Sequence, residues 1–374
     1  MKYIDEYRSP ELVRGLLQKI RKTAAKLVKP ITIMEVCGSH TTAISRFGIR
    51  QLLPDNIHLV SGPGCPVCVT SIEDIDQALW LAAQPEIIFA SYGDLLRVPG
   101  SHGNSLEKIR AAGAQIKTVH SALDAVALAQ AHPEQKIVFM GIGFETTSPT
   151  VAAAVLQAKK LGITNFFIFC SHKLMPPVMH LLLAEEKIAI DGFLCPGHVS
   201  TIIGATAYDF IIKTDRAAVI TGFEPVDILE GIALILEELT NGVTEVKIQY
   251  QRGVKEAGNP KARAIMNEVF APATVNWRGL GKIPESGLIL KEKFAAFDAR
   301  RHFSIPEISS QAHHACRCGE VLRGLIEPSE CNLFGTICTP ANPFGPCMVS
   351  NEGCCAAFFR YPMASHPKGI SCGA

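Results

Sequence analysis

The sequence has almost no net charge. Its 36 Lys and Arg residues are balanced by 35 Asp and Glu residues, which gives +1 at pH 7. Nucleic-acid binding depends on a surplus of cationic side chains. No uncharged apolar run reaches the roughly eighteen residues of a membrane span, and residues 1–10 carry both charge signs with no apolar signal segment after them. We therefore expect no nucleic-acid partner, no membrane association and a cytoplasmic location.

Motifs for nucleotide and radical chemistry are also missing. Gly141-Ile142-Gly143 is not followed by the third glycine of a dinucleotide loop, and Phe144-Glu145 stands where small residues are needed. No phosphate-binding loop with its lysine occurs, and no Cys-x3-Cys-x2-Cys motif of radical enzymes. These absences argue against dinucleotide-dependent and radical enzymes.

Cysteine, in contrast, is abundant. The chain has 13 cysteines in 374 residues, with 48% hydrophobic content that is ample for full-sized cores. Cytosolic thiols stay reduced, so we expect these cysteines to be ligands or redox groups rather than disulfides. Cys170, inside the apolar run 166–170, is the expected exception, a small core residue.

Short apolar runs alternate with helical stretches along most of the chain, which is typical of parallel sheets covered on both faces. A first helix is expected from Pro10 to about Leu27. We predict an α/β fold with two consecutive doubly wound, Rossmann-like domains, residues 1–125 and 126–270. Residues 271–374 are expected to form a linker, irregular over 271–302, and a cysteine-rich domain. The expected strands are residues 31–36, 58–61, 86–91, 115–119, 136–141, 165–170, 191–194, 217–222 and 245–250.

The motif Cys65-Pro66-Val67-Cys68 is expected just after the second strand. Two thiols at this spacing form either a redox pair or half of a metal site. We expect them to begin a helix with a capping box at residues 71–74, whose positive end would lower the thiol pKa.

The other unusual loops also follow expected strands, where ligands of open α/β sheets gather. Cys37 and His40 are three residues apart, and a thiolate with an imidazole suits iron, copper or zinc. With the dithiol they predict a joint metal site, although three thiols and an imidazole also suit structural zinc. Glu145 and His198 lie in two further loops; Glu145 either acts on protons or is satisfied by backbone amides, and His198 is equally open. We expect these loops to converge on a cleft between the two domains.

The last cysteine group is too dense for a packing role. Four thiolates hold a cubane iron–sulfur cluster, so we expect a 4Fe-4S cluster, with zinc as the alternative. His313 and His314 are expected to be exposed or to lie behind the ligands. The group consists of Cys316, Cys318, Cys331, Cys338, Cys347, Cys354 and Cys355, and all of these except Cys316 are the candidate metal ligands.

Five ordered segments resemble the signature motifs of the HypD family of nickel–iron hydrogenase maturation proteins. The resemblance implies two α/β domains, a 4Fe-4S domain, and a scaffold for the Fe(CN)2CO fragment rather than an enzyme. It also implies two partners, a small HypC-type chaperone and a HypE-type cyanide donor. The segments are Cys37-Gly38-Ser39-His40-Thr41, Gly62-Pro63-Gly64-Cys65-Pro66-Val67-Cys68, Gly143-Phe144-Glu145-Thr146-Thr147, Pro196-Gly197-His198-Val199-Ser200 and Cys316-Arg317-Cys318-Gly319-Glu320-Val321.

The resemblance also implies roles for single residues. Cys37 would be the iron-binding thiolate shared with the chaperone, and His40 a neighbouring ligand or proton group. Cys65 and Cys68 would be a redox dithiol coupled to the cluster, as in ferredoxin–thioredoxin reductase. The family's Glu-Gly-x-Cys segment appears as Glu352-Gly353-Cys354-Cys355, so Cys355 takes the family's cysteine place and Cys354 is an extra thiol. The fourth cluster ligand stays open, with Cys318 and Cys347 also available.

Two other functions are compatible with these residues. An iron–sulfur-dependent protein disulfide reductase would use Cys65 to attack and Cys68 to resolve, but it would leave Cys37 without a purpose. A zinc-stabilised interaction protein is the third interpretation. The presence of the segment from Cys37 to His40 favours the scaffold function over these two alternatives.

Overall fold

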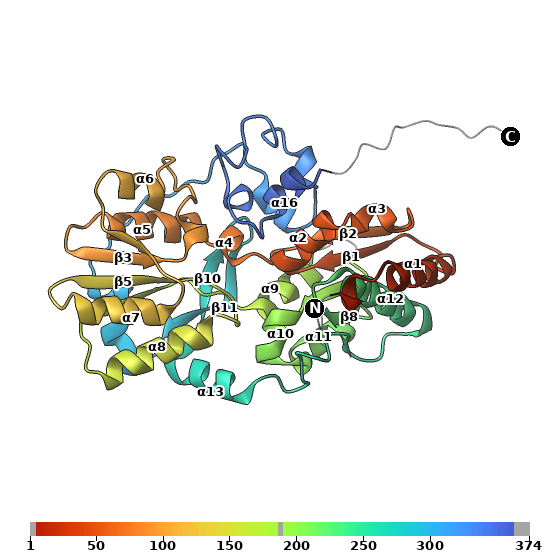
Figure 1. Cartoon of the computed structure of the whole chain (residues 1–374), viewed down its shortest axis with the longest axis horizontal. Coiled ribbons are helices and arrows are strands. Elements are labelled where there is room, and N and C mark those ends of the chain that lie inside the picture. Colours follow the sequence, from red (N-terminus) through yellow and green to blue (C-terminus); the bar gives the residue numbers. More distant parts are fainter. Residues whose placement is uncertain (1–4, 186–189, 363–374) are drawn as a thin grey trace.

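Two parallel β-sheets form the body of the protein in the computed structural model, which describes residues 5–185 and 190–362. The sheets lie beside each other, and the C-terminal segment lies above their junction in Figure 1. The first sheet has the order β2-β1-β7-β8-β9, with β1 (Ile31–Glu35), β2 (Ile57–Ser61), β7 (Gly192–Pro196), β8 (Ala217–Thr221) and β9 (Lys247–Ile248). The second has the order β4-β3-β5-β6, with β3 (Ile87–Ser91), β4 (Ile116–Thr118), β5 (Lys136–Gly141) and β6 (Phe166–Cys170).

All nine strands expected from the sequence are present. Central strands such as β3 and β5 carry almost unbroken apolar residues because helices cover both faces of their sheet. Every pairing within the two sheets is parallel. The predicted α/β class with Rossmann-like parallel sheets is therefore confirmed.

The order of the two units differs from the expected one. We expected consecutive domains, 1–125 and 126–270, but β1 and β2 pair with β7 to β9, and β3 and β4 pair with β5 and β6. The second sheet is thus inserted between β2 and β7, and the expected boundary falls inside a helix of this insert. Buried strands of both sheets have the same composition, so their sequence does not reveal which of them pair. Residues 1–4, 186–189 and 363–374 of the expected domains lie outside the described residues.

Helices cover both faces of each sheet. α5 packs on one face of the second sheet while α7 and α8 pack on the other, and α1 packs against α12 beside the first sheet. No helix in the two described ranges is both long and apolar enough to span a bilayer. The helices are α1 (Pro10–Ala24), α2 (Gly38–Arg46), α3 (Ile49–Leu52), α4 (Pro66–Val69), α5 (Ile72–Ala82), α6 (Leu106–Ala111), α7 (Ala122–Ala131), α8 (Ser148–Lys160), α9 (Met175–Leu183), α10 (Gly197–Ile203), α11 (Asp209–Ile212), α12 (Pro225–Asn241), α13 (Pro260–Val269), α14 (Ala299–His302), α15 (Cys318–Leu322) and α16 (Cys354–Arg360).

The segment 271–302, which we expected to be irregular, is mainly a β-hairpin. Strands β10 (Phe270–Trp277) and β11 (Gly281–Leu290) pair antiparallel, and they lie between the two sheets in Figure 1. Gly279 and Gly281 have positive φ angles of 76° and 81°, which the tight connection requires. Pro272 is tolerated because the hairpin is a two-stranded sheet, in which both strands are edge strands. The glycines and prolines that suggested irregularity therefore serve a hairpin.

The cysteine-rich segment is held against α2. Ser39 Oγ donates to Glu352 Oε1 at 2.9 Å, and Thr42 Oγ1 donates to the carbonyl of Asn351 at 2.9 Å. A Cβ on Gly38 would lie 2.4 Å from Cβ of Glu352, so the glycine permits this close approach. The C-terminal segment is thereby placed over the loops that end β1 and β2.

Those two loops touch backbone to backbone. The amide of Gly38 donates to the carbonyl of Gly64 at 3.0 Å. A Cβ on Gly64 would lie 2.2 Å from the amide nitrogen of Cys37 and 2.4 Å from its Cα. Only a residue without a side chain fits between Cys37 and Cys65 at this contact.

Gly64→Ala is expected to destabilise the protein by about 1–3 kcal/mol, because the new methyl group meets backbone that cannot move aside. Gly15→Ala is the matched control: it lies within α1, its Cβ would meet nothing within 4 Å, and it should stabilise by about 0.5–1 kcal/mol. Thermal unfolding of both variants measures the difference. Equal melting temperatures for Gly64→Ala and the unmodified chain would contradict the contact.

Candidate functional site

Cys37 lies at the carboxyl end of β1 and forms the N-cap of α2. Its side chain is 8% exposed. Burial and, after it, the charge of Glu352 raise the pKa of the Cys37 thiol to about 12, while the amides of Ser39 and His40 donate to the sulfur and act in the opposite direction. The group is therefore a neutral thiol at pH 7, with two N–H donors already aimed at the position of a thiolate.

Glu35, two residues earlier, is buried beneath this loop. Its Oε2 accepts from the amide of Cys37 at 3.1 Å, and its Oε1 accepts from Thr41 Oγ1 at 2.6 Å. Burial raises the pKa of Glu35 to about 7 despite these hydrogen bonds. The carboxyl group joins the end of β1 to the first turn of α2.

His40 is buried on the other side of α2, toward the end of β8. Its Nε2 lies 2.9 Å from the carbonyl of Gly222, which can only accept, so Nε2 carries the proton. Its Nδ1 is buried and has no hydrogen-bond partner in the part of the chain that the structure describes. Burial lowers the pKa of His40 to about 4, so the imidazole is neutral and Nδ1 retains a free lone pair.

The Cys65 and Cys68 pair lies on a single turn of helix. Cys65 is the N-cap of α4, and its sulfur accepts from the amide of Cys68 at 3.2 Å. Our expectation of one helix with a capping box is wrong: α4 ends at Val69, and a separate helix, α5, begins after Ser71, whose Oγ accepts from the amide of Asp74. The expected lowering of the Cys68 pKa is also wrong, because burial raises the pKa of this thiol well above its usual value.

A series of thiol contacts connects this pair to the cysteine-rich segment. The Cys68 thiol lies close enough to the thiols of Cys65 and Cys347 for both to shift its pKa. Cys347 interacts in the same way with Cys318, and Cys318 with Cys316. Five sulfur atoms from three parts of the chain thus form one continuous path.

The cysteine-rich segment surrounds a small cavity of about 20 Å³, room for about one water molecule. No group of three or more His, Cys, Asp or Glu side chains within residues 5–185 and 190–362 is arranged to hold a metal ion. The remaining lining is mostly apolar, with Val321, Leu333, Phe334 and Met348. The cavity thiols are Cys316, Cys318, Cys331, Cys338, Cys347 and Cys355.

Cys354 lies apart from these six thiols. It packs with Val321 and Phe358, and its thiol is hydrogen-bonded to Ser61. The adjacent Cys355 lines the cavity instead, because neighbouring residues at the start of α16 point in different directions. Of the six tail cysteines we expected to bind metal, Cys354 is thus the one that does not face the cavity.

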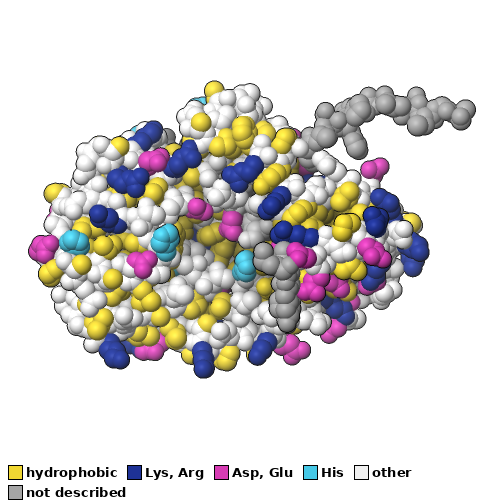
Figure 2. Space-filling model, viewed as in Figure 1, with side chains coloured by type: hydrophobic (Ala, Val, Ile, Leu, Met, Phe, Trp, Pro, Cys, Tyr) yellow, Lys and Arg dark blue, Asp and Glu magenta, His cyan; other side chains and the backbone are white. Residues whose placement is uncertain are grey.

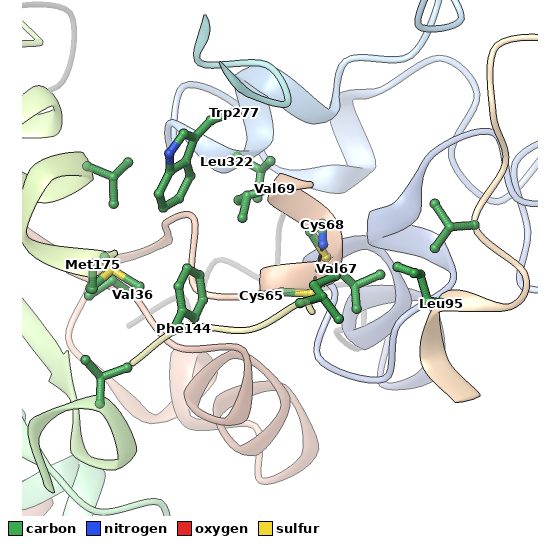
Figure 3. Close-up of a cluster of buried hydrophobic side chains, with 14 of the residues drawn as sticks. Val36, Cys65, Val67, Cys68, Val69, Leu95, Phe144, Met175, Trp277 and Leu322 are labelled. Atoms are coloured by element: carbon green, nitrogen blue, oxygen red, sulfur yellow. Dashed lines mark hydrogen bonds between the residues drawn. The ribbon is translucent and has the colours of Figure 1, made fainter. Parts of the chain in front are cut away.

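The loop after β5 reaches the same region. Phe144 belongs to the hydrophobic cluster of Cys65, Cys68 and Met175, and it lies between Cys65 and Met175 in Figure 3. Glu145 accepts from the amide of Met175 at 2.9 Å through Oε1, whereas its buried Oε2 has no hydrogen-bond partner among residues 5–185 and 190–362. Burial raises the pKa of Glu145 to about 7.

The loop after β7 approaches from the first sheet. His198 is exposed, and its ring stacks on Phe223 with centroids 4.0 Å apart. Phe223 also contacts the His40 ring at 4.8 Å. His198 thus contacts the aromatic ring beside His40, whereas Glu145 contacts Met175, and residues of both loops belong to the hydrophobic cluster of the dithiol. Figure 2 shows a hollow near the middle of one face, with hydrophobic side chains at its floor and acidic and histidine side chains around it.

Two residues of the site were not anticipated for these positions. Tyr208 is fully buried, its hydroxyl is hydrogen-bonded to Ser200 Oγ at 3.1 Å, and it lies close enough to the ionisable groups of Cys37 and Glu145 for them to affect its pKa. Glu352 was noted only as part of a family segment, and the structure places its carboxylate on Ser39, beside Cys37. The proximity of Tyr208 to Cys37 and the contact of Glu352 with Ser39 have no local sequence signal, because each joins residues far apart in the chain.

The chain matches the family model described as "HypD: Hydrogenase formation hypA family" over residues 11–362. It is 46% identical over 369 residues to the hydrogenase maturation factor HypD of Rhizobium leguminosarum bv. viciae, covering 96% of each chain. It is 44% identical over 367 residues to that of Escherichia coli strain K12, covering 96% of this chain and 98% of the relative.

An archaeal protein is similar over nearly the same length. It is a putative hydrogenase expression/formation protein of Methanocaldococcus jannaschii, 44% identical over 351 residues, which covers 94% of this chain and 97% of the relative. These matches span both sheets and the cysteine-rich segment. The chain belongs to the HypD family of hydrogenase maturation factors.

Proposed function

We propose that this chain is an assembly scaffold that holds iron at Cys37 while cyanide and carbon monoxide become its ligands. A role in hydrogenase maturation follows from the family. The observation that supports the finer role is the arrangement of three thiol groups: Cys37 meets the loop of Cys65 at Gly64, and Cys68 meets Cys347 of the cysteine-rich segment. The proposed metal-binding thiol, Cys37, thus lies beside the dithiol. The dithiol in turn contacts the thiols of the cysteine-rich segment.

The surroundings of Cys37 suit an iron fragment as cargo. Metal binding displaces the thiol proton, and the amides of Ser39 and His40 would stabilise the resulting thiolate. Soft thiolate ligation tolerates strong-field ligands such as cyanide. His40 is neutral with a free Nδ1 and can serve as a second ligand or a proton acceptor. The 8% exposure of Cys37 leaves an edge that a small HypC-type chaperone could share and a HypE-type donor could reach.

Cys65 and Cys68 would supply electrons. Forming a disulfide between them would give two electrons to the iron fragment and release two protons, and exchange with an external dithiol, itself oxidised to a disulfide, would re-form the Cys65–Cys68 dithiol. The donor set of the cavity, six thiols among apolar side chains, fits a 4Fe-4S cluster, which takes four thiolates. Such a cluster would supply one-electron transfer; binding it requires the cavity of about 20 Å³ to widen. Thiol chemistry of this kind suits the reducing cytoplasm.

Glu145 would hold a proton near the dithiol. Its pKa of about 7 keeps the carboxyl group partly protonated at neutral pH, and its free Oε2 can give or take a proton. The protein disulfide reductase remains the second function, since it needs the same dithiol and the same cavity thiols. It does not need Cys37.

Cys37→Ser should abolish the infrared bands of iron-bound cyanide and carbon monoxide in the anaerobically purified complex with its chaperone, because a serine hydroxyl is a hard and weakly acidic ligand. Cys195→Ala, which removes a fully buried thiol of β7 outside the site, should leave the bands in place. Bands of full strength in Cys37→Ser would exclude iron binding at this thiol and favour the reductase.

Cys354→Ser and Cys355→Ser form a matched pair at adjacent positions. Cys355 lines the cavity and Cys354 does not, so only Cys355→Ser should lower iron and acid-labile sulfide from about four of each per chain. Metal and sulfide analysis of anaerobically purified protein measures this. Loss of iron in Cys354→Ser with full content in Cys355→Ser would reverse the assignment.

Glu145 should make stability depend on pH. Its folded pKa of about 7 lies above the ordinary 4.5, so the folded state binds more protons, and this stabilisation is lost as the pH rises through 7. Between pH 5 and 8 the unmodified chain should lose about 3 kcal/mol of its free energy of unfolding through this group, and Glu145→Gln should not show that loss. Exposed Glu134→Gln is the control. Identical melting temperature profiles for Glu145→Gln and the unmodified chain would show that the carboxyl group is ionised throughout.

A further inference from the structure

Arg278, at the tip of the β10–β11 hairpin, is a buried cation with no carboxylate partner among the residues that the structure describes. Its side chain is 7% exposed. Its Nε donates to the carbonyl of Thr70 at 3.1 Å, but its buried Nη2 has no acceptor within the described ranges. Leaving a buried guanidinium N–H without an acceptor costs free energy, so we expect an acceptor for this group in the space that it faces.

The carboxylates of the neighbouring helix α5 are all engaged elsewhere, with amide, hydroxyl or other cationic groups. None of them forms an ion pair with Arg278 in the described part of the chain. Their contacts are Glu73 with Asn276, Asp74 with Lys173 and Arg300, and Asp76 with Ser101 and Ser310.

The hairpin tip is held rigidly in this position. The amide of Arg278 donates to the carbonyl of Val69 at 2.9 Å, so the tip is tied to the end of the dithiol helix. A Cβ on Gly279 would lie 2.3 Å from Cα of Gly319, so the tip also touches the start of α15. Trp277, the preceding residue, lies near Leu322 and Phe144 in Figure 3. The guanidinium group therefore has little freedom to turn toward a different partner.

A pocket of about 310 Å³ opens at this point, between the unit of the second sheet and the cysteine-rich segment. Its size is at the lower end of small-molecule sites. Three cationic side chains line it, Arg278, Arg97 and Lys108, against the single carboxylate of Glu107. That carboxylate is already paired with Arg97 at 3.8 Å. The pocket thus has a positive excess with its most buried cation unpaired.

We propose that this pocket binds a small oxyanion, the carboxylate or phosphate group of a small molecule, with Arg278 as its buried ligand and Lys108 at its exposed rim. The guanidinium fork matches the geometry of either group. Cys316 and Cys318 line the same pocket, so the anion sits beside one end of the thiol series. The site is separate from Cys37 and does not depend on the proposed scaffold role.

The test is titration calorimetry of the anaerobically purified full chain with inorganic phosphate and with citrate. One binding site is expected, weakened by added salt because it is charge-based. Tighter binding of phosphate would indicate a phosphate ligand, and tighter binding of citrate a carboxylate ligand. Failure of both anions to bind at concentrations up to about 10 mM would overturn the proposal.

Three variants test whether Arg278 and Lys108 bind the anion. Arg278→Gln should weaken binding at least about tenfold. Lys108→Glu, an exposed change that the fold tolerates, should weaken it several-fold, and Lys293→Gln, which lies outside the pocket, should bind like the unmodified chain. Unchanged affinity in both pocket variants would overturn the proposal. So would unchanged affinity of Arg278→Gln with loss of bound iron, since Arg278 would then serve the Cys316 and Cys318 thiolates.

Discussion

The close contact between the backbones of Cys37 and Gly64 is the constraint on which the site depends. Parallel pairing of β1 with β2 brings their carboxyl ends to one edge of the sheet, and the missing side chain of Gly64 allows the two loops to touch. This contact places a buried thiol next to a buried dithiol. Each group that follows, from Glu352 above to His40 on the far side of α2, is arranged around it.

Burial is the physical property that the thiols share. It raises the pKa of Cys37, Cys68 and Cys355, so these groups are neutral in the absence of a metal. A neutral thiol is a poor nucleophile and is oxidised more slowly than a thiolate. A bound metal reverses this preference by displacing the proton. The same low-polarity surroundings that keep the free thiols protonated would therefore strengthen the binding of a soft metal by these thiols.

The inserted second sheet is what buries the dithiol helix α4 within the site. Because the chain leaves the first sheet after β2 and returns at β7, the loops of both sheets and the tip of the β-hairpin enclose the dithiol helix. Phe144 comes from one sheet, Cys65 from the other, and Trp277 from the hairpin, yet all three pack in one hydrophobic cluster. A single parallel sheet would leave the short helix α4 exposed on one side. The insertion instead buries it.

Local patterns in the chain were enough to predict most elements and the chemistry of their loops. Apolar runs placed all nine strands, and the unusual residues do follow β1, β2, β5 and β7; periodicity and cysteine spacing are local properties. The hairpin over residues 270–290 was missed because its glycines and prolines resemble those of a linker. Which strands share a sheet and which thiols meet depended instead on the tertiary structure, as in the insertion between β2 and β7 and the contact of Cys68 with Cys347. The position of the Arg278 guanidinium, whose Nη2 has no acceptor among the described residues, also depended on the tertiary structure. Local sequence patterns do not predict such contacts, because the free energy that favours one set of contacts over another arises when whole surfaces pack together.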